Sequence, residues 1–409
     1  MAIKLSEKYL RQITDVVNSA SVARWWDVLE QPQFDNLVLS VAKLHHLRLS
    51  ERDAHMALIR GLLDCMDGFD LPSLKSPVPE ELERRVRNAI FEKLRTLIES
   101  FPWDFEVKFP LPRFENFGPF EFDLSESVVL RNALDEPQPH GLQALRVSTG
   151  RRLIQICVKA NGYADSDPGG NAVSQAISRA KQVLYFLDTF SLSTWFHGDV
   201  RSEETYAMVS QERVAIRLPD SLTNYLCGLT PKSDLMTIYG DESGTLLGGA
   251  LRAADTPEER VEALSLKLDA AKTFFSREAH ADFEAIGAAM EWYIDSVTAD
   301  NQTFAYIAAC IGLEALLGYG TDDPSDKMEA MSVRLSDRYG FLLGVGRADR
   351  EKLSNEFREM LKLRGKLVHA RNKRLNADQR AKLYGVQNML SSVIRQEVKT
   401  MTSTNTKRA

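Results

Sequence analysis

The 409-residue sequence has few of the residues that build metal sites or disulfide frameworks. Its four cysteines stand singly, with no C-x-x-C pair and no histidine at metal-ligand spacing, at Cys65, Cys157, Cys227 and Cys310. Single scattered cysteines are typical of reduced cytosolic thiols, whereas zinc sites need grouped ligands. We therefore expect no metal, no other cofactor and a cytoplasmic protein.

Long apolar runs are also absent. No stretch approaches the roughly 20 apolar residues of a membrane helix, and residues 1–8 lack the apolar core of a secretion signal. Hydrophobic residues make up 44% and charged residues 26% of the chain, and its length is sufficient for two or three domains. These features predict a soluble protein that does not contact membranes.

Phosphate-binding loops are missing as well. Gly169-Gly170 precedes a predicted helix, but neither the G-x-x-x-x-G-K-[ST] loop nor the G-x-G-x-x-G fingerprint occurs. Asp165 and Asp167 would repel a phosphate, so we interpret this segment as a plain loop. The net charge of -6 argues against nucleic-acid binding by the whole surface. One basic island exists, because residues 362–382 contain eight Lys or Arg and one acidic residue.

Hydrophobic periodicity predicts a multidomain α+β protein that is predominantly helical. We expect an N-terminal helical region over 1–100, an α+β region of regulatory or sensory role over 101–250, a helical bundle over 255–400 and a flexible tail over 401–409. Strand-like runs are expected at 105–109, 120–124, 145–147, 153–158, 205–209 and 212–218, with a helix at 172–187. In the C-terminal part we expect helices at 257–275, 277–298, 303–317, 327–343, 349–371 and 377–400.

The predicted helix 349–371 has a charged residue on its apolar side. Helical spacing places four residues on one stripe, namely Phe357, Leu361, Arg364 and Val368. His369 follows Arg364 by five positions and belongs to a neighbouring basic stripe. An R-x4-H pattern often occurs by chance, and a surface helix with a paired arginine and a solvated histidine is the simpler interpretation.

A second charged exception lies in the segment 303–317, which is otherwise nearly all apolar. A helix that is apolar on every side is the central helix of a bundle, so Glu314 must point into protein and needs a partner. Arg364, Arg334 and Arg338 are the candidates. An Arg–Glu pair would either hold a guanidinium beside a reaction centre or only specify packing.

The C-terminal third resembles the Apea-like group of HEPN domains. Four blocks carry the resemblance in order: 290–293 (Met-Glu-Trp-Tyr), 312–318 (Gly-Leu-Glu-Ala-Leu-Leu-Gly), 333–344 (with Val-Arg-Leu-Ser-Asp-Arg and Phe-Leu-Leu-Gly) and 363–369 (Leu-Arg-Gly-Lys-Leu-Val-His). The resemblance implies a helical bundle that forms a homodimer and cuts RNA without metal, as a toxin or abortive-infection effector in bacterial defence against phage. It also implies that Arg364 and His369 are catalytic.

The chemistry of RNA cleavage suits these residues. A histidine can move the protons, an arginine can stabilise the phosphorane, and a dimer supplies a second histidine. Glu314 would position Arg364. Five basic residues would hold flanking phosphates of the RNA, transfer RNA being one candidate: Lys362, Lys366, Arg371, Lys373 and Arg374.

One departure from the family pattern weakens the catalytic assignment, because Gly365 stands where a polar residue is common. The alternatives are a non-catalytic HEPN module for RNA or nucleotide binding or for dimerisation, and an unrecognised enzyme in the region 101–250. In the nuclease interpretation, a phage-derived trigger or a regulatory partner acts through the N-terminal regions.

Overall fold

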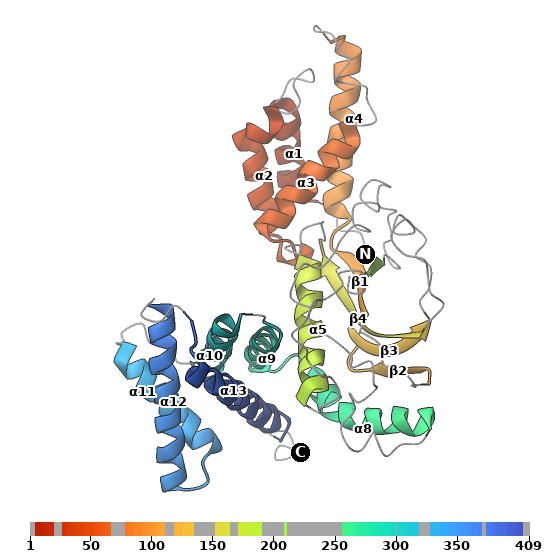
Figure 1. The fold of residues 1–409 in the computed structure, drawn as a ribbon. Helices are drawn as coiled ribbons and strands as arrows, with labels where there is room; N and C mark the ends of the chain where they lie inside the picture. The colour runs from red at the N-terminus through yellow and green to blue at the C-terminus, as the bar shows by residue number, and fades with distance from the viewer. Residues whose placement is uncertain are drawn as a thin grey trace.

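The computed structural model describes residues 5–19, 27–66, 78–110, 118–134, 152–163, 171–189, 208–210, 256–299, 301–318, 328–369 and 374–403. Within these ranges the chain is predominantly helical, with one antiparallel sheet (Figure 1). No helix in them is both long and apolar enough to cross a membrane.

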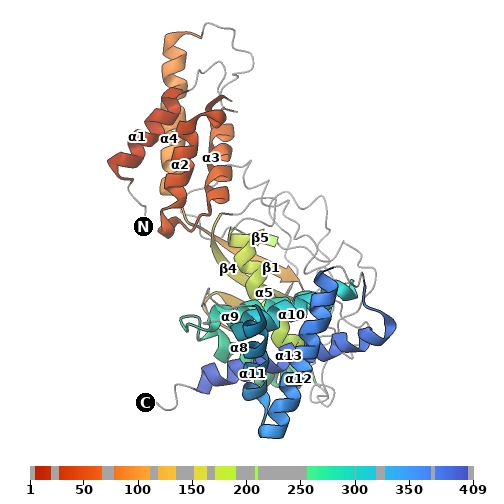
Figure 2. The ribbon, with the colours of Figure 1, turned by 90° about the vertical axis from the view of Figure 1, so that its left-hand side faces the viewer.

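The N-terminal region is helical, as predicted. It contains α1 (Glu7–Ser19), α2 (Pro32–Ala42), a 3-10 turn (His45–Leu47), α3 (Glu51–Met66) and α4 (Glu80–Glu99). The helices bury one apolar face each against one another, and they stand at one end of the molecule (Figure 2). A capping box starts α3, because Asp53 N donates to Ser50 Oγ and Ser50 N donates to Asp53 Oδ2, both at 3.0 Å.

A five-stranded sheet follows, with the strand order β2-β3-β4-β1-β5. The strands are β1 (Trp103–Pro110), β2 (Phe120–Asp123), β3 (Val128–Leu134), β4 (Arg152–Gly162) and β5 (Met208–Ser210). All pairings are antiparallel, with Val107 opposite Val158 and Leu130 opposite Ile156. The sequence patterns did not predict β3. The expected strands at 145–147 and 212–218, and the Gly169-Gly170 loop, lie outside the described residues.

The C-terminal part consists of α8 (Pro257–Phe275), α9 (Phe283–Thr298), α10 (Gln302–Gly318), α11 (Met328–Leu343), α12 (Arg347–Val368) and α13 (Ala377–Ser403). Helix α8 starts where predicted. Thr256, just before Pro257, and Glu259 in the first turn form a capping box. Helix α10 is central and contacts α9, α12 and α13. Ser296 Oγ on α9 donates to Ala305 O at 2.7 Å, and Gln387 on α13 donates to Ser296 Oγ at 3.0 Å.

Three predicted boundaries were wrong. Residues 277–282 form turns rather than the start of a helix, because the chain changes direction between α8 and α9. Phe274 at the end of α8 thereby stacks on Phe283 at the start of α9, with ring centroids 4.5 Å apart. Helix α12 ends at Val368 instead of Arg371. Helix α13 continues to Ser403, beyond the expected start of the flexible tail at residue 401.

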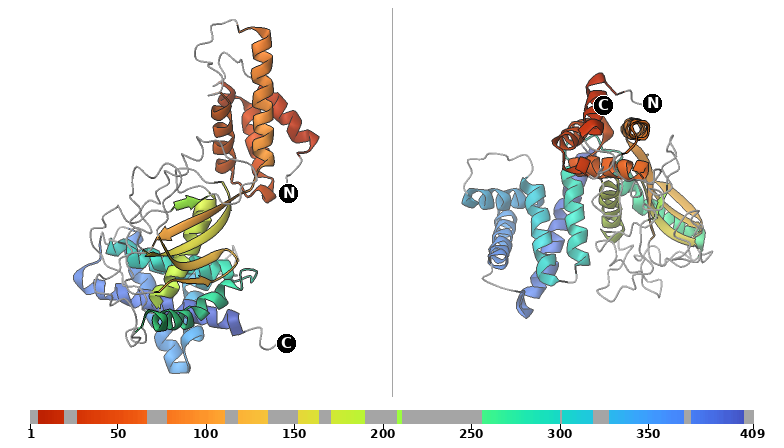
Figure 3. Two further views of the ribbon diagram at one scale, coloured as in Figure 1. Left: turned by 90° about the vertical axis from the view of Figure 1, so that its right-hand side faces the viewer. Right: turned by 90° about the horizontal axis from the view of Figure 1, so that it is seen from above.

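Helix α5 (Asn171–Thr189) joins the sheet to the C-terminal helices. It packs on β4 through one side and on α9 through another, and it lies between the sheet and the C-terminal helices when seen from above (Figure 3). Residues 181–187 are all buried. The sheet and the C-terminal helices therefore share one apolar core.

Two glycines of the C-terminal helices differ in the space around them, which predicts opposite effects of alanine. A Cβ at Gly312 would lie 2.9 Å from Trp292 Cβ and 2.9 Å from Leu390 Cδ2, whereas nothing lies within 4 Å of one at Gly385. We expect Gly312→Ala to destabilise the protein by about 1–3 kcal/mol because of overpacking. Gly385→Ala should stabilise it by up to about 1 kcal/mol through helix propensity. Chemical denaturation of both variants measures this, and equal stabilisation by both would contradict the close approach at Gly312.

Candidate functional site

The side chain of Arg364 lies at the margin of the buried face of α12. That face consists of Ser354, Phe357, Met360, Leu363 and Leu367. The side chain of Arg364 is 29% exposed, so it is half-buried rather than central to the core. Val368 is 46% exposed, and its predicted place on the buried stripe is therefore wrong. After Phe357, the buried positions are 360, 363 and 367, each one residue before the expected positions 361, 364 and 368.

Glu314 on α10 pairs with Arg364, across 50 residues of sequence. Arg364 Nη2 donates to Glu314 Oε2 at 3.3 Å, and Arg364 Nε lies 3.2 Å from Glu314 Oε1. The second contact is within ion-pair distance but lacks hydrogen-bond geometry. The carboxylate therefore meets the guanidinium side-on. Of the three arginines that the sequence offered as partners of Glu314, the structure selects Arg364.

The other two candidate arginines have different partners. Arg338 donates to the carbonyl of Leu317 at 2.7 Å and lies 3.7 Å from Glu397. Arg334 is exposed and contacts the sulfur of Met331 at 3.9 Å. Arg338 thus holds the end of α10 without contacting Glu314.

Burial sets the electrostatics of the pair. Desolvation raises the pKa of Glu314, and the charge of Arg364 opposes that rise. Cys310 lies one turn before Glu314, and burial raises the pKa of its thiol above the usual range, with the Glu314 charge adding to the rise. The cysteine is therefore a buried, protonated thiol rather than a nucleophile.

Helices α10 and α12 are also joined by contacts at Met360. Tyr306 Oη donates to Met360 O at 3.2 Å, and Cys310 Sγ lies 3.1 Å from Met360 Sδ. Both side chains are buried. The stripe Tyr306, Cys310, Glu314 thus faces Met360 and Arg364, and it fixes the position of the guanidinium.

His369 lies at the exposed end of α12. Its backbone N donates to Gly365 O at 3.0 Å, and its conformation (φ -87°, ψ 22°) ends the helix. Farther along the chain, Leu375 N donates to Thr303 Oγ1 at the start of α10, at 3.1 Å. The imidazole is exposed, and Arg364 is half-buried.

The predicted phosphate-binding residues are only partly described. Lys362, Lys366 and Arg374 are exposed, while Arg371 and Lys373 lie outside the described residues. Lys362 pairs with Glu359 at 2.6 Å, and this contact lowers the pKa of that carboxyl. Glu359 therefore reduces the positive charge of the basic face.

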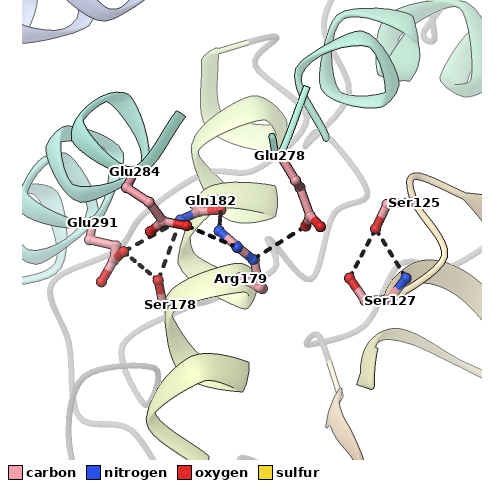
Figure 4. A network of polar contacts seen from close by, with 8 residues as sticks. All are labelled: Ser125, Ser127, Ser178, Arg179, Gln182, Glu278, Glu284 and Glu291. Atoms are coloured by element: carbon pink, nitrogen blue, oxygen red, sulfur yellow. Dashed lines mark hydrogen bonds and ion pairs between the residues drawn. The ribbon is translucent and has the colours of Figure 1, made fainter. Parts of the chain in front are cut away.

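A second polar cluster, which sequence patterns did not reveal, joins α5 to α9 (Figure 4). Arg179 Nη1 donates to Gln182 Oε1 at 3.1 Å, and its guanidinium lies 3.3 Å from Glu284 and 3.5 Å from Glu278. Gln182 is fully buried and donates to Glu291 at 3.4 Å.

The same interface contains a buried ion pair and a close backbone approach. Lys181 Nζ lies 2.6 Å from Asp295 Oδ1, and Lys181 is buried. A Cβ at Gly287 would lie 2.5 Å from Gln182 Nε2, so glycine allows α9 to approach α5. The polar pair Lys181-Gln182 inside an apolar run was the available sequence signal for this cluster.

The described residues contain no group of three or more His, Cys, Asp or Glu that could hold a metal ion. Within them, the strongest constellation is the pair Glu314–Arg364 with His369 at the end of the same helix.

The ion pair predicts a pH-dependent loss of stability in Arg364→Met. The pKa of Glu314 is raised in the native state, so between the unfolded pKa of about 4.3 and the native pKa the native state binds more protons than the unfolded state. The free energy of unfolding therefore falls as the pH rises between these two pKa values. Without Arg364 the pKa of Glu314 rises further, so the interval widens. We expect the loss to be about 1–2 kcal/mol near pH 7, between the values for exposed and buried pairs, and smaller near pH 5.

Urea denaturation at the two pH values measures this loss. The double variant Arg364→Met, Glu314→Gln should show less pH dependence than the single variant. Arg347→Met removes an arginine from an exposed pair with Glu351 on the same helix and should change stability little. A loss that is equal at both pH values would contradict a role for the Glu314 charge.

In comparisons with known proteins, the chain matches no family model, no curated protein and no solved structure.

Proposed function

We propose that the C-terminal helices form a metal-independent endoribonuclease in which Arg364 and His369 act on one phosphodiester of RNA. The observation that carries this proposal is the side-on contact of Glu314 with Nε and Nη2 of Arg364. Among the described residues, Nη1 makes no hydrogen bond. That edge is therefore available to a phosphate oxygen, and the guanidinium is already oriented.

The chemical roles follow from the environments of the two residues. His369, which is exposed, would take the proton from a 2′-hydroxyl, whose oxygen then attacks the adjacent phosphorus. Arg364 would stabilise the negative charge of the phosphorane. The 5′-oxygen that leaves needs a proton, and His369 of a second copy in a homodimer would supply it. Lys362, Lys366 and Arg374 would hold neighbouring phosphates, as would Arg371 and Lys373.

The setting that we propose is bacterial defence against phage or toxin activity, with the N-terminal regions controlling the nuclease. The contacts of α5 with α9 support this arrangement, because α9 packs on α10, which carries Glu314. A trigger or regulatory partner that shifts α5 would then act on the position of Arg364 through two packed helices.

A second candidate is a non-catalytic module that binds RNA or nucleotide or forms dimers. Two observations favour it. The charge of Arg364 is already compensated by Glu314, and Glu359 lies on the basic face beside Lys362. In this case RNA would be retained and not cut.

The decisive assay incubates the full-length protein with total RNA and transfer RNA in the presence of EDTA. We expect the wild type to leave 2′,3′-cyclic phosphate ends and His369→Ala to lose about 10²–10⁴ of the rate. The matched control is His46→Ala, which removes an exposed histidine from the N-terminal region and should keep full activity. Cleavage that survives in His369→Ala, or that EDTA abolishes, would exclude this mechanism. Retention of RNA without cleavage would favour the binding module.

Gly365 gives a separate prediction about the substrate. Nothing lies within 4 Å of a Cβ built there, so Gly365→Ala should fold and stabilise α12 by up to about 1 kcal/mol. If the RNA backbone approaches this glycine, the same variant should cut RNA more slowly although its folded state is at least as stable as that of the wild type. Thermal unfolding and the cleavage assay measure both effects. Full activity in Gly365→Ala would show that the glycine does not contact the substrate.

A further inference from the structure

A cavity of about 300 Å³ lies between α5, α8 and α13, away from the Glu314–Arg364 pair. Figure 1 shows the last turns of α13 beside the ends of α5 and α8. The volume is at the lower end of the range for small-molecule sites, which is roughly 300–1,000 Å³.

The floor of the cavity is aromatic and apolar. It is formed by Tyr185 and Phe186 of α5, with Val398 of α13 at the side. Both aromatic residues are almost fully buried, and Tyr185 Oη donates to Ser391 O at 3.2 Å. Because the hydroxyl already has its partner, the small part of the Tyr185 ring that borders the cavity is apolar.

The rim of the cavity is positively charged. Arg395 and Lys399 lie one turn apart on α13, and both are exposed. In the part of the chain that the structure describes, neither has a carboxylate within ion-pair distance. Arg395 only contacts Ser391 O at 3.3 Å and Ser392 Oγ at 3.5 Å through Nε and Nη2. Like charges at i and i+4 destabilise a helix unless an anion compensates them.

The cavity also has a polar group that can accept or share a hydrogen bond. The hydroxyl of Thr273 on α8 donates to Asp269 O at 2.7 Å, and its oxygen remains able to accept. Thr402 of α13 also lines the cavity, and its hydroxyl donates to Lys399 O at 3.0 Å. Two cations, two hydroxyls and an apolar floor together match a molecule with one charged end and one apolar end.

We infer that this cavity binds a small amphipathic anion, with its carboxylate between Arg395 and Lys399 and its short apolar tail on Tyr185, Phe186 and Val398. The site does not depend on the proposed nuclease activity. A ligand there contacts α5, α8 and α13 at once, so its binding stabilises the packing of the sheet region on the C-terminal helices.

The test uses the full-length protein with sodium octanoate, and octan-1-ol as a neutral probe with the same tail. Calorimetry should show that octanoate binds at least about tenfold more tightly than octanol, equivalent to about 1.4 kcal/mol. The double variant Arg395→Gln, Lys399→Gln should weaken octanoate binding about tenfold or more and leave octanol binding unchanged. Arg347→Gln, which removes an exposed arginine elsewhere, should bind as the wild type does.

A cavity-filling variant completes the test. Ala270 lines the cavity from α8, and Ala270→Leu should prevent binding of both probes while keeping the helical circular dichroism spectrum. The inference is overturned if octanoate does not bind, if octanol binds equally well, or if the double variant binds octanoate as the wild type does.

Discussion

The burial of most of α10 is the constraint on which the C-terminal structure depends, although Phe304 and Ala315 are exposed and the helix is therefore not covered on every side as the sequence predicted. Nine of its residues are buried, and they require cover from α9, α12 and α13 at the same time. A helix of this kind can hold a carboxylate only where a neighbouring helix brings a cation. Glu314 meets that condition through Arg364, and this contact orients the guanidinium, while the contacts of Tyr306 and Cys310 with Met360 also hold α12 on α10.

The two residues of the R-x4-H pattern consequently have different environments. Arg364 is held by a half-buried ion pair, while His369 lies past the last helical turn and faces solvent. A fixed cation and an accessible imidazole, five residues apart at the end of one helix, are the two features on which the nuclease proposal rests. The expected substrate contacts accordingly lie at the C-terminal end of α12.

The sheet region and the C-terminal helices meet through α5, where polar contacts accompany apolar packing. Arg179, Gln182 and Lys181 all reach carboxylates of the C-terminal part. Buried polar contacts need specific partners, so they define one register of α5 on α9 and make sliding costly. Movement in the sheet region would therefore be transmitted to α9. The cavity beside Tyr185 also lies along α5.

Local patterns in the sequence determined most elements of this protein. Helical periodicity placed α1 to α4 and the six C-terminal helices, alternation placed β1 and β2, and a strand-like run placed β4, because these signals depend on neighbours within a few residues. The apolar sequence around Glu314 also showed that this carboxylate needs a cation. Strand β3 was not predicted, since residues 128–134 do not alternate strictly between polar and apolar residues.

Only the tertiary structure decided which cation Glu314 receives. The pattern offered Arg364 as the charged exception on its own helix and left Arg334 and Arg338 as alternatives; the packing of helices 50 residues apart selected Arg364, while Arg338 contacts Leu317 O and Glu397. The end of α12, the contacts of α5 with α9 and the cavity between α5, α8 and α13 were decided in the same way. Each of them depends on how distant segments pack, and the periodicity of a single segment carries no information about its distant neighbours.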